Sequence, residues 1–425
     1  DFYGSYGCTD FFNSTTATAT LPILDCGAVD FLAAPGVYNN REPGGSVAQR
    51  EMQDSFWLRG EMFVAEEDSR THLEDTFYRD AMGLYDVRDS IVTLKRDFSR
   101  VLTDDIYAWW FDQHETGGRY MHSEIYKLFK RQEEIAEFAY SLNREKKNEI
   151  AFIYDQESCH TVSMYTNTLM LDYYRTSDLP RIGASVDYYF HDDMGREDMP
   201  DYKFYMMNLF DISDKEREII IQKAKKNHAV VLWLYAPGFI NPDRDQVMAN
   251  ENIQELTGFK VGRFDHTCSP RFKVTNLDHP AVRYAVEDRR YGYIDRDVHS
   301  NVWLENVILP PYMNPGFYID DPEATILGTY CEMGVPAYGL KEMDGWTSVY
   351  CAPQILRSEL LASLAEYAGC HLYNKDDDVL YSNQNFVTIH AAYKGKHTLY
   401  FKEPVSLYEV YEKQYYGHNV TSIEL

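Results

Sequence analysis

The distribution of apolar and polar positions divides the first part of the chain into short apolar runs and longer amphipathic segments. Apolar runs at 29–35, 62–66 and 106–112 predict buried strands, because a strand covered on both faces has few polar positions. Apolar residues three and four positions apart predict helices at 89–103 and 123–146. Strands that alternate with helices form parallel sheets, so residues 1–147 are predicted to form an α/β unit.

A second α/β unit is predicted after the charged linker at 143–148. Apolar runs at 150–154, 204–210 and 229–235 predict strands. Ser213 and Glu216 have the spacing of a capping box, which begins a helix between the last two of these strands. A final helix is predicted at 354–368, ending at Gly369. Residues 148–372 are therefore predicted to form a doubly wound domain.

The pattern changes again in the last segment, 373–425. Alternation at 385–393, a turn at 394–396 and a return at 397–401 predict a β-hairpin. Further strands are predicted at 406–411 and 420–425. We expect these strands to form a small antiparallel β-sandwich.

Candidate chemistry lies at the ends of two predicted strands. The strand at 62–66 ends in Glu66, followed by Glu67, Asp68 and Arg70, and the strand at 106–112 ends in two tryptophans and Asp112. The carboxyl ends of strands in α/β barrels hold the active site. Carboxylates cleave glycosidic bonds and flat aromatic faces bind sugar rings, so the pattern favours a sugar-cleaving site. The alternative is two ordinary strand ends with solvated charges.

Composition excludes several other classes. A net charge of −26, from 67 acidic and 41 basic residues, argues against nucleic acid or an anionic membrane as a partner. The seven cysteines are dispersed without a Cys-x-x-Cys pair, which indicates free thiols rather than disulfides or a zinc site. No apolar run is long enough to span a bilayer. The acidic run 376–378 is interpreted as a solvated turn, no Gly-rich phosphate loop is present, and we expect neither metal nor cofactor.

The three-part order resembles the β-galactosidases of glycoside hydrolase family 42 and their relatives. The match rests on 29–35 with Tyr38 and Arg41, on 65–71, on 109–112 and on 231–238. The resemblance implies the C-terminal half of a TIM (β/α)8 barrel at 1–147. It implies a class I glutamine-amidotransferase-like trimerisation domain at 148–372 and a β-sandwich at 373–425. The implied activity is that of a retaining, exo-acting β-galactosidase working as a homotrimer on a carbohydrate substrate.

The resemblance also implies roles for single residues. Strands five to eight of the barrel would be 2–5, 29–35, 62–66 and 107–111. The nucleophilic glutamate of these enzymes ends the seventh strand, which implies Glu66, with Glu67 as the fallback because neighbours on a strand point to opposite faces. Trp110 would stack under the sugar, with Trp109 and Tyr38 nearby, and Asp112 or Arg41 would hydrogen-bond its hydroxyls. For Arg70 we favour a salt bridge that holds Asp68 and lowers the pKa of that carboxyl.

One part of the family pattern is missing. A retaining glycosidase needs a second carboxylate about 5–5.5 Å from the first, and in this family it belongs to an Asn-Glu pair that would lie before residue 1. The pairs Asn148-Glu149 and Asn250-Glu251 fall outside the barrel part and are interpreted as surface coincidences. We therefore expect a longer polypeptide with roughly 200 or more further barrel residues.

Two other functions remain as alternatives to the enzyme. The first is a non-catalytic glycan-binding or scaffolding protein that lacks the acid/base carboxylate. The second is amidotransferase chemistry, which needs a cysteine on a sharp turn after a strand. The corresponding strand ends in Tyr235-Ala-Pro-Gly238, so this activity is not expected.

Overall fold

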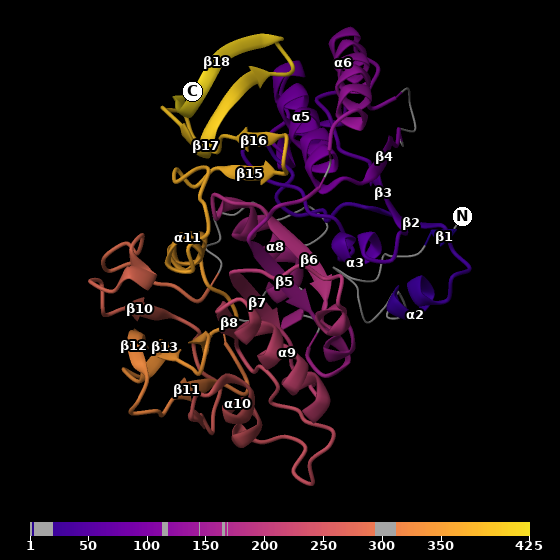
Figure 1. Cartoon of the computed structure of the whole chain (residues 1–425). Coiled ribbons are helices and arrows are strands. Elements are labelled where there is room, and N and C mark those ends of the chain that lie inside the picture. The colour runs from indigo at the N-terminus through magenta and orange to yellow at the C-terminus, as the bar shows by residue number, and fades with distance from the viewer. Residues whose placement is uncertain are drawn as a thin grey trace.

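The computed structural model describes residues 2–3, 20–112, 118–143, 145–163, 166–167, 169–293 and 312–425. These residues form a four-stranded sheet, an eight-stranded sheet and three two-stranded sheets. Figure 1 shows the four-stranded sheet and its helices on one side of the large central sheet, with the C-terminal hairpins beside helix α5. The predicted α/β class is confirmed. Among the residues described, no helix has the length and apolar content needed to cross a bilayer.

The first sheet is parallel throughout, in the order β1 (Phe2–Tyr3), β2 (Phe31–Pro35), β3 (Met62–Glu67) and β4 (Tyr107–Trp110). The predicted strands lie close to these positions, although the end of the run expected at 2–5 falls outside the described residues. One face packs on α3 (Gln53–Trp57) and α5 (Val87–Asp104). Its apolar contacts come from alternate strand residues, Leu32, Ala34, Phe63 and Ala65, packed with Phe56 and Val101.

Helix α5 buries a more polar face than its apolar periodicity predicts. Leu94 and Val101 are buried as expected, but most of the buried positions on this helix are polar or charged: Ser90, Thr93, Arg96, Asp97, Ser99, Arg100, Thr103 and Asp104. Helix α6 (Ser123–Tyr140) packs beside it (Figure 1). Buried charges are rare unless they are paired, so this face of α5 indicates a polar network within the fold.

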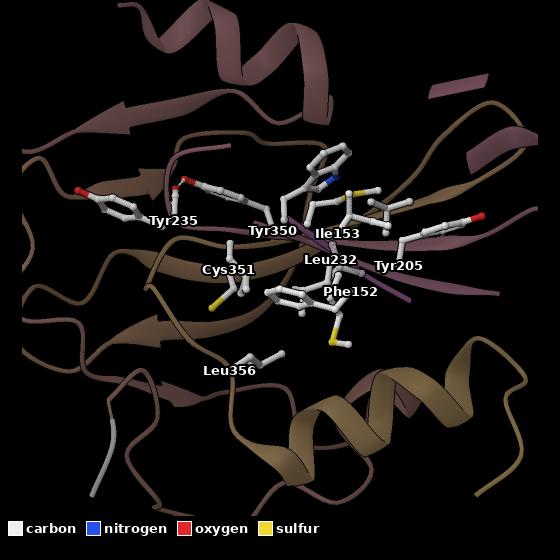
Figure 2. Packing of buried hydrophobic residues seen from close by; sticks show 14 of the residues in the cluster. Phe152, Ile153, Tyr205, Leu232, Tyr235, Tyr350, Cys351 and Leu356 are labelled. Carbon is white, nitrogen blue, oxygen red and sulfur yellow. Dashed lines mark hydrogen bonds between the residues drawn. The ribbon is translucent and has the colours of Figure 1, made fainter. Parts of the chain in front are cut away.

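The central sheet is mixed. Its parallel strands are β6 (Val186–Phe190), β5 (Ile150–Tyr154), β7 (Phe204–Asn208), β8 (Val230–Leu234) and β14 (Thr347–Cys351), and its antiparallel strands are β13 (Pro336–Glu342), β12 (Thr325–Tyr330) and β10 (Phe272–Val274). Every residue of the five parallel strands is buried, which explains the apolar runs that predict β5, β7 and β8. Figure 2 shows Phe152, Leu232 and Tyr350 in this core.

Two helices predicted from the sequence are present in the part of the chain that forms the central sheet. The capping box at Ser213 and Glu216 is confirmed at the start of α9 (Asp214–Lys226). The last predicted helix is α11 (Ser358–Tyr367). The remaining elements are α2 (Thr20–Asp25), α4 (Thr76–Ala81), α8 (Tyr174–Ser177), α10 (Asn250–Thr257), β9 (Val261–Arg263) and β11 (Phe317–Ile319), with short 3-10 or π turns between them.

The C-terminal segment forms two hairpins rather than the predicted sandwich. β15 (Val379–Ser382) pairs with β16 (Val387–His390), and β17 (Thr398–Glu409) pairs with β18 (Gln414–Glu424), each as a separate sheet. The hairpin predicted between 385–393 and 397–401 is therefore wrong. Asn383 explains the difference, because its Oδ1 accepts hydrogen bonds from the backbone N–H groups of Asn385 and Phe386 and closes a tight turn before β16.

Contacts cross both predicted domain boundaries. Lys146 lies between Asp54 and Asp187, with its Nζ 2.5 Å and 3.6 Å from their carboxylates. The hydroxyl of Tyr381 lies 3.1 Å from both the backbone nitrogen and the carbonyl oxygen of Val47. The boundaries at 147 and 372 stay predictions.

Candidate active site

The register of the first sheet separates the two candidate glutamates. Glu66 pairs with Pro35 and Trp109, whereas Glu67 pairs with Trp110. Side chains alternate along a strand, and directly paired residues on neighbouring strands share a face. Because Phe63 and Ala65 point toward the α3 and α5 core, Glu67 points to that helix-covered face as well. Glu66 points to the opposite face.

The face that carries Glu66 is partly open and aromatic. Met62 and Trp109 on this face are 38% and 36% exposed, respectively, while Glu66 at the carboxyl end of β3 is only 4% exposed. The structure therefore brings Trp109 beside Glu66. An indole beside a carboxylate provides a flat apolar surface at the place where that carboxylate can react.

Trp110 lies on the other face and is not brought to Glu66. Its ring stacks on Phe129 of α6, with ring centroids 4.6 Å apart and planes at 19°. It also meets the ring of Tyr120 edge-on at 5.8 Å. These contacts place Trp110 in the packing between β4 and α6, so its position does not fit the sugar-stacking role that the family resemblance implies.

The environment of Glu67 disfavours a role as nucleophile. Burial, together with the nearby charges of Asp97 and Asp68, raises the pKa of Glu67 to about 8 against the opposing charges of Arg41 and Arg96. Glu67 is therefore mostly protonated at neutral pH. A protonated carboxyl group is a poor nucleophile, which favours Glu66 for attack on a sugar.

Asp68 is held by two residues from the loop after β2. Its Oδ1 lies 2.6 Å from the guanidinium of Arg41, and its Oδ2 accepts a hydrogen bond of 3.0 Å from the Tyr38 hydroxyl. Burial alone would raise the pKa of Asp68, but the charge and hydrogen bond of Arg41 outweigh it and hold this pKa below its ordinary value. Arg41 also donates to the carbonyl oxygens of Gly36 and Val37. With these donors engaged, Arg41 is placed to support the loop rather than a sugar hydroxyl.

The predicted pair between Arg70 and Asp68 is wrong. The Arg70 guanidinium lies 3.5 Å from Glu74 and 3.6 Å above the ring centroid of Tyr78. Arg41 occupies the position at Asp68 because the loop after β2 runs alongside the carboxyl end of β3, which a sequence cannot show. Arg70 is part of the outer loop that follows β3.

Asp112, which follows β4, is hydrogen-bonded to the backbone at the other end of the loop that begins there. Its Oδ1 accepts a hydrogen bond of 2.6 Å from the backbone N–H of Arg119. Arg119 in turn lies 2.7 Å from Glu74, and the hydroxyl of Tyr120 lies 3.0 Å from the carbonyl oxygens of both Glu67 and Ser69. The loops after β3 and β4 are therefore tied together around the candidate site, although residues 113–117 lie outside the described part of the chain.

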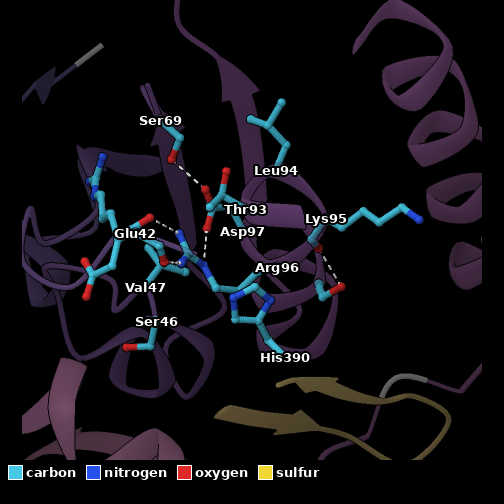
Figure 3. Close-up of polar contacts among 12 residues, drawn as sticks. Glu42, Ser46, Val47, Ser69, Thr93, Leu94, Lys95, Arg96, Asp97 and His390 are labelled. Atoms are coloured by element: carbon cyan, nitrogen blue, oxygen red, sulfur yellow. Dashed lines mark hydrogen bonds and ion pairs between the residues drawn. The ribbon is translucent and has the colours of Figure 1, made fainter. Parts of the chain in front are cut away.

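A buried Arg96–Asp97 pair on α5 supports the loops that follow β2 and β3 (Figure 3). Asp97 accepts a hydrogen bond of 2.5 Å from the Ser69 hydroxyl, and Arg96 donates to the carbonyl oxygens of Arg41 and Glu42 at 3.0 and 2.9 Å. The sequence alone does not reveal this pair. The available signal was the helical spacing of polar residues at 90, 93, 97, 100 and 104.

Comparison with known proteins identifies solved structures with a similar fold. No family model matches the sequence, and no curated protein matches it. Solved structures do match: Gan42B, a GH42 β-galactosidase from G. stearothermophilus, has a TM-score of 0.58 and 12% identity over 95% of this chain and 59% of its own. The cold-adapted β-galactosidase from Rahnella sp. R3 has a TM-score of 0.59 and 11% identity over 98% of this chain and 61% of its own.

This chain shares the fold of GH42 β-galactosidases. The β-galactosidase from Bacillus circulans sp. alkalophilus agrees, with a TM-score of 0.54 and 10% identity over 93% of this chain. The chain spans between 59% and 63% of the length of these enzymes. The resemblance inferred from the sequence is confirmed at the level of the fold.

The two Asn-Glu pairs of the chain lie away from the first sheet. Glu149 precedes β5 of the central sheet, and its carboxylate contacts Lys203 at 2.5 Å and Lys402 at 3.0 Å. Together with the backbone N–H of His371, these partners hold the pKa of Glu149 below its ordinary value against the effect of burial. Glu251 is exposed in the first turn of α10. Neither residue has the environment of a proton donor for Glu66.

Among the residues that the structure describes, one group of side chains is close enough to hold a metal ion. Ligand atoms of Asp376, Asp378 and His397 lie within 4.8 Å of one another. The Nδ1 of His397 lies 2.6 Å from Asp378, and its Nε2 lies 3.0 Å from the carbonyl oxygen of Tyr393. The hydrogen bond to Asp378 raises the pKa of His397. A protonated imidazole satisfies both contacts without a metal ion.

Proposed function

We propose that this protein is a retaining, exo-acting glycoside hydrolase of the β-galactosidase type, with Glu66 as its nucleophile. The observation that carries the proposal is the placement of Glu66 at the carboxyl end of β3, on the open aromatic face beside Trp109. Carboxyl strand ends are where barrel enzymes hold their reactive groups. The fold shared with GH42 β-galactosidases supports the same assignment.

In this proposal, Glu66 attacks the anomeric carbon of a terminal sugar that stacks on Trp109. A covalent glycosyl-enzyme forms as the bond to the leaving oxygen breaks. The leaving oxygen takes a proton from a second carboxylic acid, which then activates the water that releases the sugar. We propose that this acid comes from polypeptide outside the 425 residues, as part of the same chain or of a partner chain. The central domain is proposed to form a homotrimer.

The supporting residues have defined tasks in this scheme. Asp68, Arg41 and Tyr38 hold the loops after β2 and β3 in one arrangement. Asp112 and Arg119 do the same for the loop after β4. Terminal β-galactosides are the proposed substrates, and β-mannosides and α-L-arabinopyranosides are the closest alternatives to test.

Replacement of Glu66 tests the proposal. Glu66→Gln preserves the size of the side chain but removes the nucleophilic charge, so turnover of an aryl β-galactoside is expected to fall by at least about 1,000-fold. Glu67→Gln is the matched control, and we expect it to keep most of the activity because Glu67 is already neutral. The measurement is kcat with folding verified by circular dichroism.

The opposite pattern would contradict the assignment. Activity retained by Glu66→Gln and lost by Glu67→Gln would mean that the strand register differs from the one described. Sugar binding without any hydrolysis by the wild-type protein would instead support the non-catalytic, glycan-binding alternative.

A further inference from the structure

The loop after β2 makes a tight turn at residues 40–46. Asn40 begins this turn in the left-handed region, with φ of 56°, a conformation that asparagine adopts more readily than most residues. The backbone closes the turn, because the N–H of Ser46 donates to the carbonyl oxygen of Asn40 at 2.7 Å. Tyr38 and Arg41 lie on either side of Asn40 in the sequence. The turn therefore sets the direction in which both side chains leave the loop.

A single residue of the central part of the chain, Thr176 on α8, contacts both ends of this turn. Its Oγ1 accepts a hydrogen bond of 3.1 Å from Nδ2 of Asn40, and its carbonyl oxygen accepts one of 2.6 Å from the hydroxyl of Ser46. The Thr176 hydroxyl donates to the carbonyl oxygen of Asp172 at 2.9 Å, so Asn40 must present its NH2 group to the remaining lone pairs. Thr176, Asn40 and Ser46 are all buried, and loss of either contact leaves a polar group unpaired.

The neighbouring Arg175 extends this contact along the loop. Its Nη1 donates to the carbonyl oxygen of Gln49 at 2.8 Å, and its Nη2 donates to that of Arg50 at 3.4 Å. The same loop begins at Pro35, which pairs with Glu66 across β2 and β3. Helix α8, which lies between β5 and β6 in the sequence, is therefore bound to a loop that starts beside the proposed nucleophile.

We propose that Thr176 is a positioning residue of the candidate active site. By holding both ends of the turn at 40–46, it places Arg41 against Asp68, two residues after Glu66. A displaced Arg41 would shift the chain that follows the nucleophile, and small misplacements of a reacting group slow its chemistry. The central sheet then contributes to the geometry of the site. The effect on catalysis rests on the proposed function, whereas the hold on the loop does not.

Amide hydrogen exchange tests the hold on the loop. Thr176→Val keeps the shape of the side chain but removes the oxygen that accepts from Asn40. Loss of one neutral hydrogen bond predicts about fivefold faster exchange in residues 36–50. Thr176→Ser keeps the oxygen and should restore the wild-type rate.

Thr257→Val is the matched control for this exchange experiment. It removes an equally buried hydroxyl, which donates to the carbonyl oxygen of Ile253 within α10, and it should leave exchange in residues 36–50 unchanged. Unchanged exchange in Thr176→Val, or equal acceleration by Thr257→Val, would overturn the proposal.

Covalent labelling with a dinitrophenyl 2-deoxy-2-fluoro-β-galactoside tests the effect on the nucleophile. At saturating reagent, Thr176→Val should be labelled at least about threefold more slowly than wild type, with the half-saturating concentration unchanged, because the change affects orientation rather than binding. Thr176→Ser should be labelled at the wild-type rate. An unchanged rate in Thr176→Val, or a slow rate that Thr176→Ser does not restore, would contradict the positioning role.

A double variant separates positioning from a general loss of stability. Tyr38→Phe removes the hydroxyl that donates to Asp68, so it acts on the same contact as Thr176→Val. The double variant should therefore lose less labelling rate than the product of the two single losses, whereas independent effects would multiply. Losses that multiply would overturn the positioning role. A wild-type protein that takes up no label would contradict the proposed function, and hydrogen exchange then decides whether Thr176 holds the loop.

Discussion

Adjacent residues on β3 and β4 have opposite environments, and this alternation determines the proposed chemistry. Glu66 and Trp109 share the open face, whereas Glu67 and Trp110 share the face covered by α5 and α6. The sequence places both glutamates at the end of a strand and both tryptophans at the end of the next. It cannot show which face the helices cover, because both residues of each pair have the same side-chain chemistry. The register of the folded sheet supplies that information.

The raised pKa of Glu67 predicts a pH-dependent stability. In the unfolded chain its pKa is near the ordinary value of 4.5, and in the folded protein it is about 8. Between these values the folded state holds the extra proton, so the free energy of unfolding falls as the pH rises through this window, by up to about 1.4 kcal/mol per pH unit for one group. Glu67→Gln has no such proton. Urea unfolding at several pH values should therefore show a flatter profile for Glu67→Gln, and identical slopes for the two proteins would contradict the assignment.

The ion pair between Arg41 and Asp68 predicts a large loss of stability when Asp68 is neutralised. Both side chains are nearly fully buried, so Asp68→Asn leaves Arg41 without its counter-charge and is expected to cost about 3–5 kcal/mol. Arg70→Gln is the matched comparison. Arg70 is more exposed and lies 3.5 Å from Glu74, so its loss should cost about 1 kcal/mol or less. Denaturant unfolding measures the loss of stability in both variants. A larger loss for Arg70→Gln than for Asp68→Asn would contradict the assignment of Arg41 as the partner of Asp68.

At the scale of elements, the sequence locates helices and strands well where burial is continuous. β5 begins and ends where predicted, because all five of its residues are apolar and buried. The C-terminal hairpins are different, because short half-exposed strands have no strong periodicity and their pairing depends on turns. The turn at Asn383 pairs β16 with β15. The polar face of α5 is not predicted, because the apolar residues that define the helix periodicity lie on another face, where Phe98 and Leu102 are only partly buried.

The hairpin of β15 and β16 is predicted to stabilise the loop that carries Tyr38 and Arg41. The Nε2 of His390 accepts a hydrogen bond of 2.8 Å from the backbone N–H of Gly44. Burial, together with the charges of Arg96 and Arg181, lowers the pKa of His390 to about 3, so the ring is a neutral acceptor. His390→Leu removes this acceptor and should speed amide hydrogen exchange in residues 36–50 severalfold, with β5 unaffected.

His418→Leu is the control for this experiment. His418 is exposed on β18 and contacts Ser406, so its replacement should leave exchange in residues 36–50 unchanged. Equal exchange rates in this loop for wild type and His390→Leu would show that the hairpin does not stabilise it.

At the scale of the whole molecule, ion pairs between buried side chains connect the first α/β unit to the central sheet and its connections. Lys146 bridges Asp54 and Asp187, and Arg59 reaches Asp193 at 2.7 Å. The fold shared with GH42 β-galactosidases covers nearly all of this chain, including both the first sheet and the central sheet. The homotrimer and the source of the second carboxylate stay proposals at this scale.

The most direct test of the account is covalent labelling with a dinitrophenyl 2-deoxy-2-fluoro-β-galactoside, followed by peptide mapping. The dinitrophenolate departs without a proton, so formation of the glycosyl-enzyme requires the nucleophile but not the second carboxylic acid. The fluorine slows release of the sugar, and the label accumulates. We expect one fluorosugar attached to Glu66 and none attached to Glu66→Gln. A label on Glu67, or a folded wild-type protein that takes up no label, would contradict the assignment of Glu66 as the nucleophile.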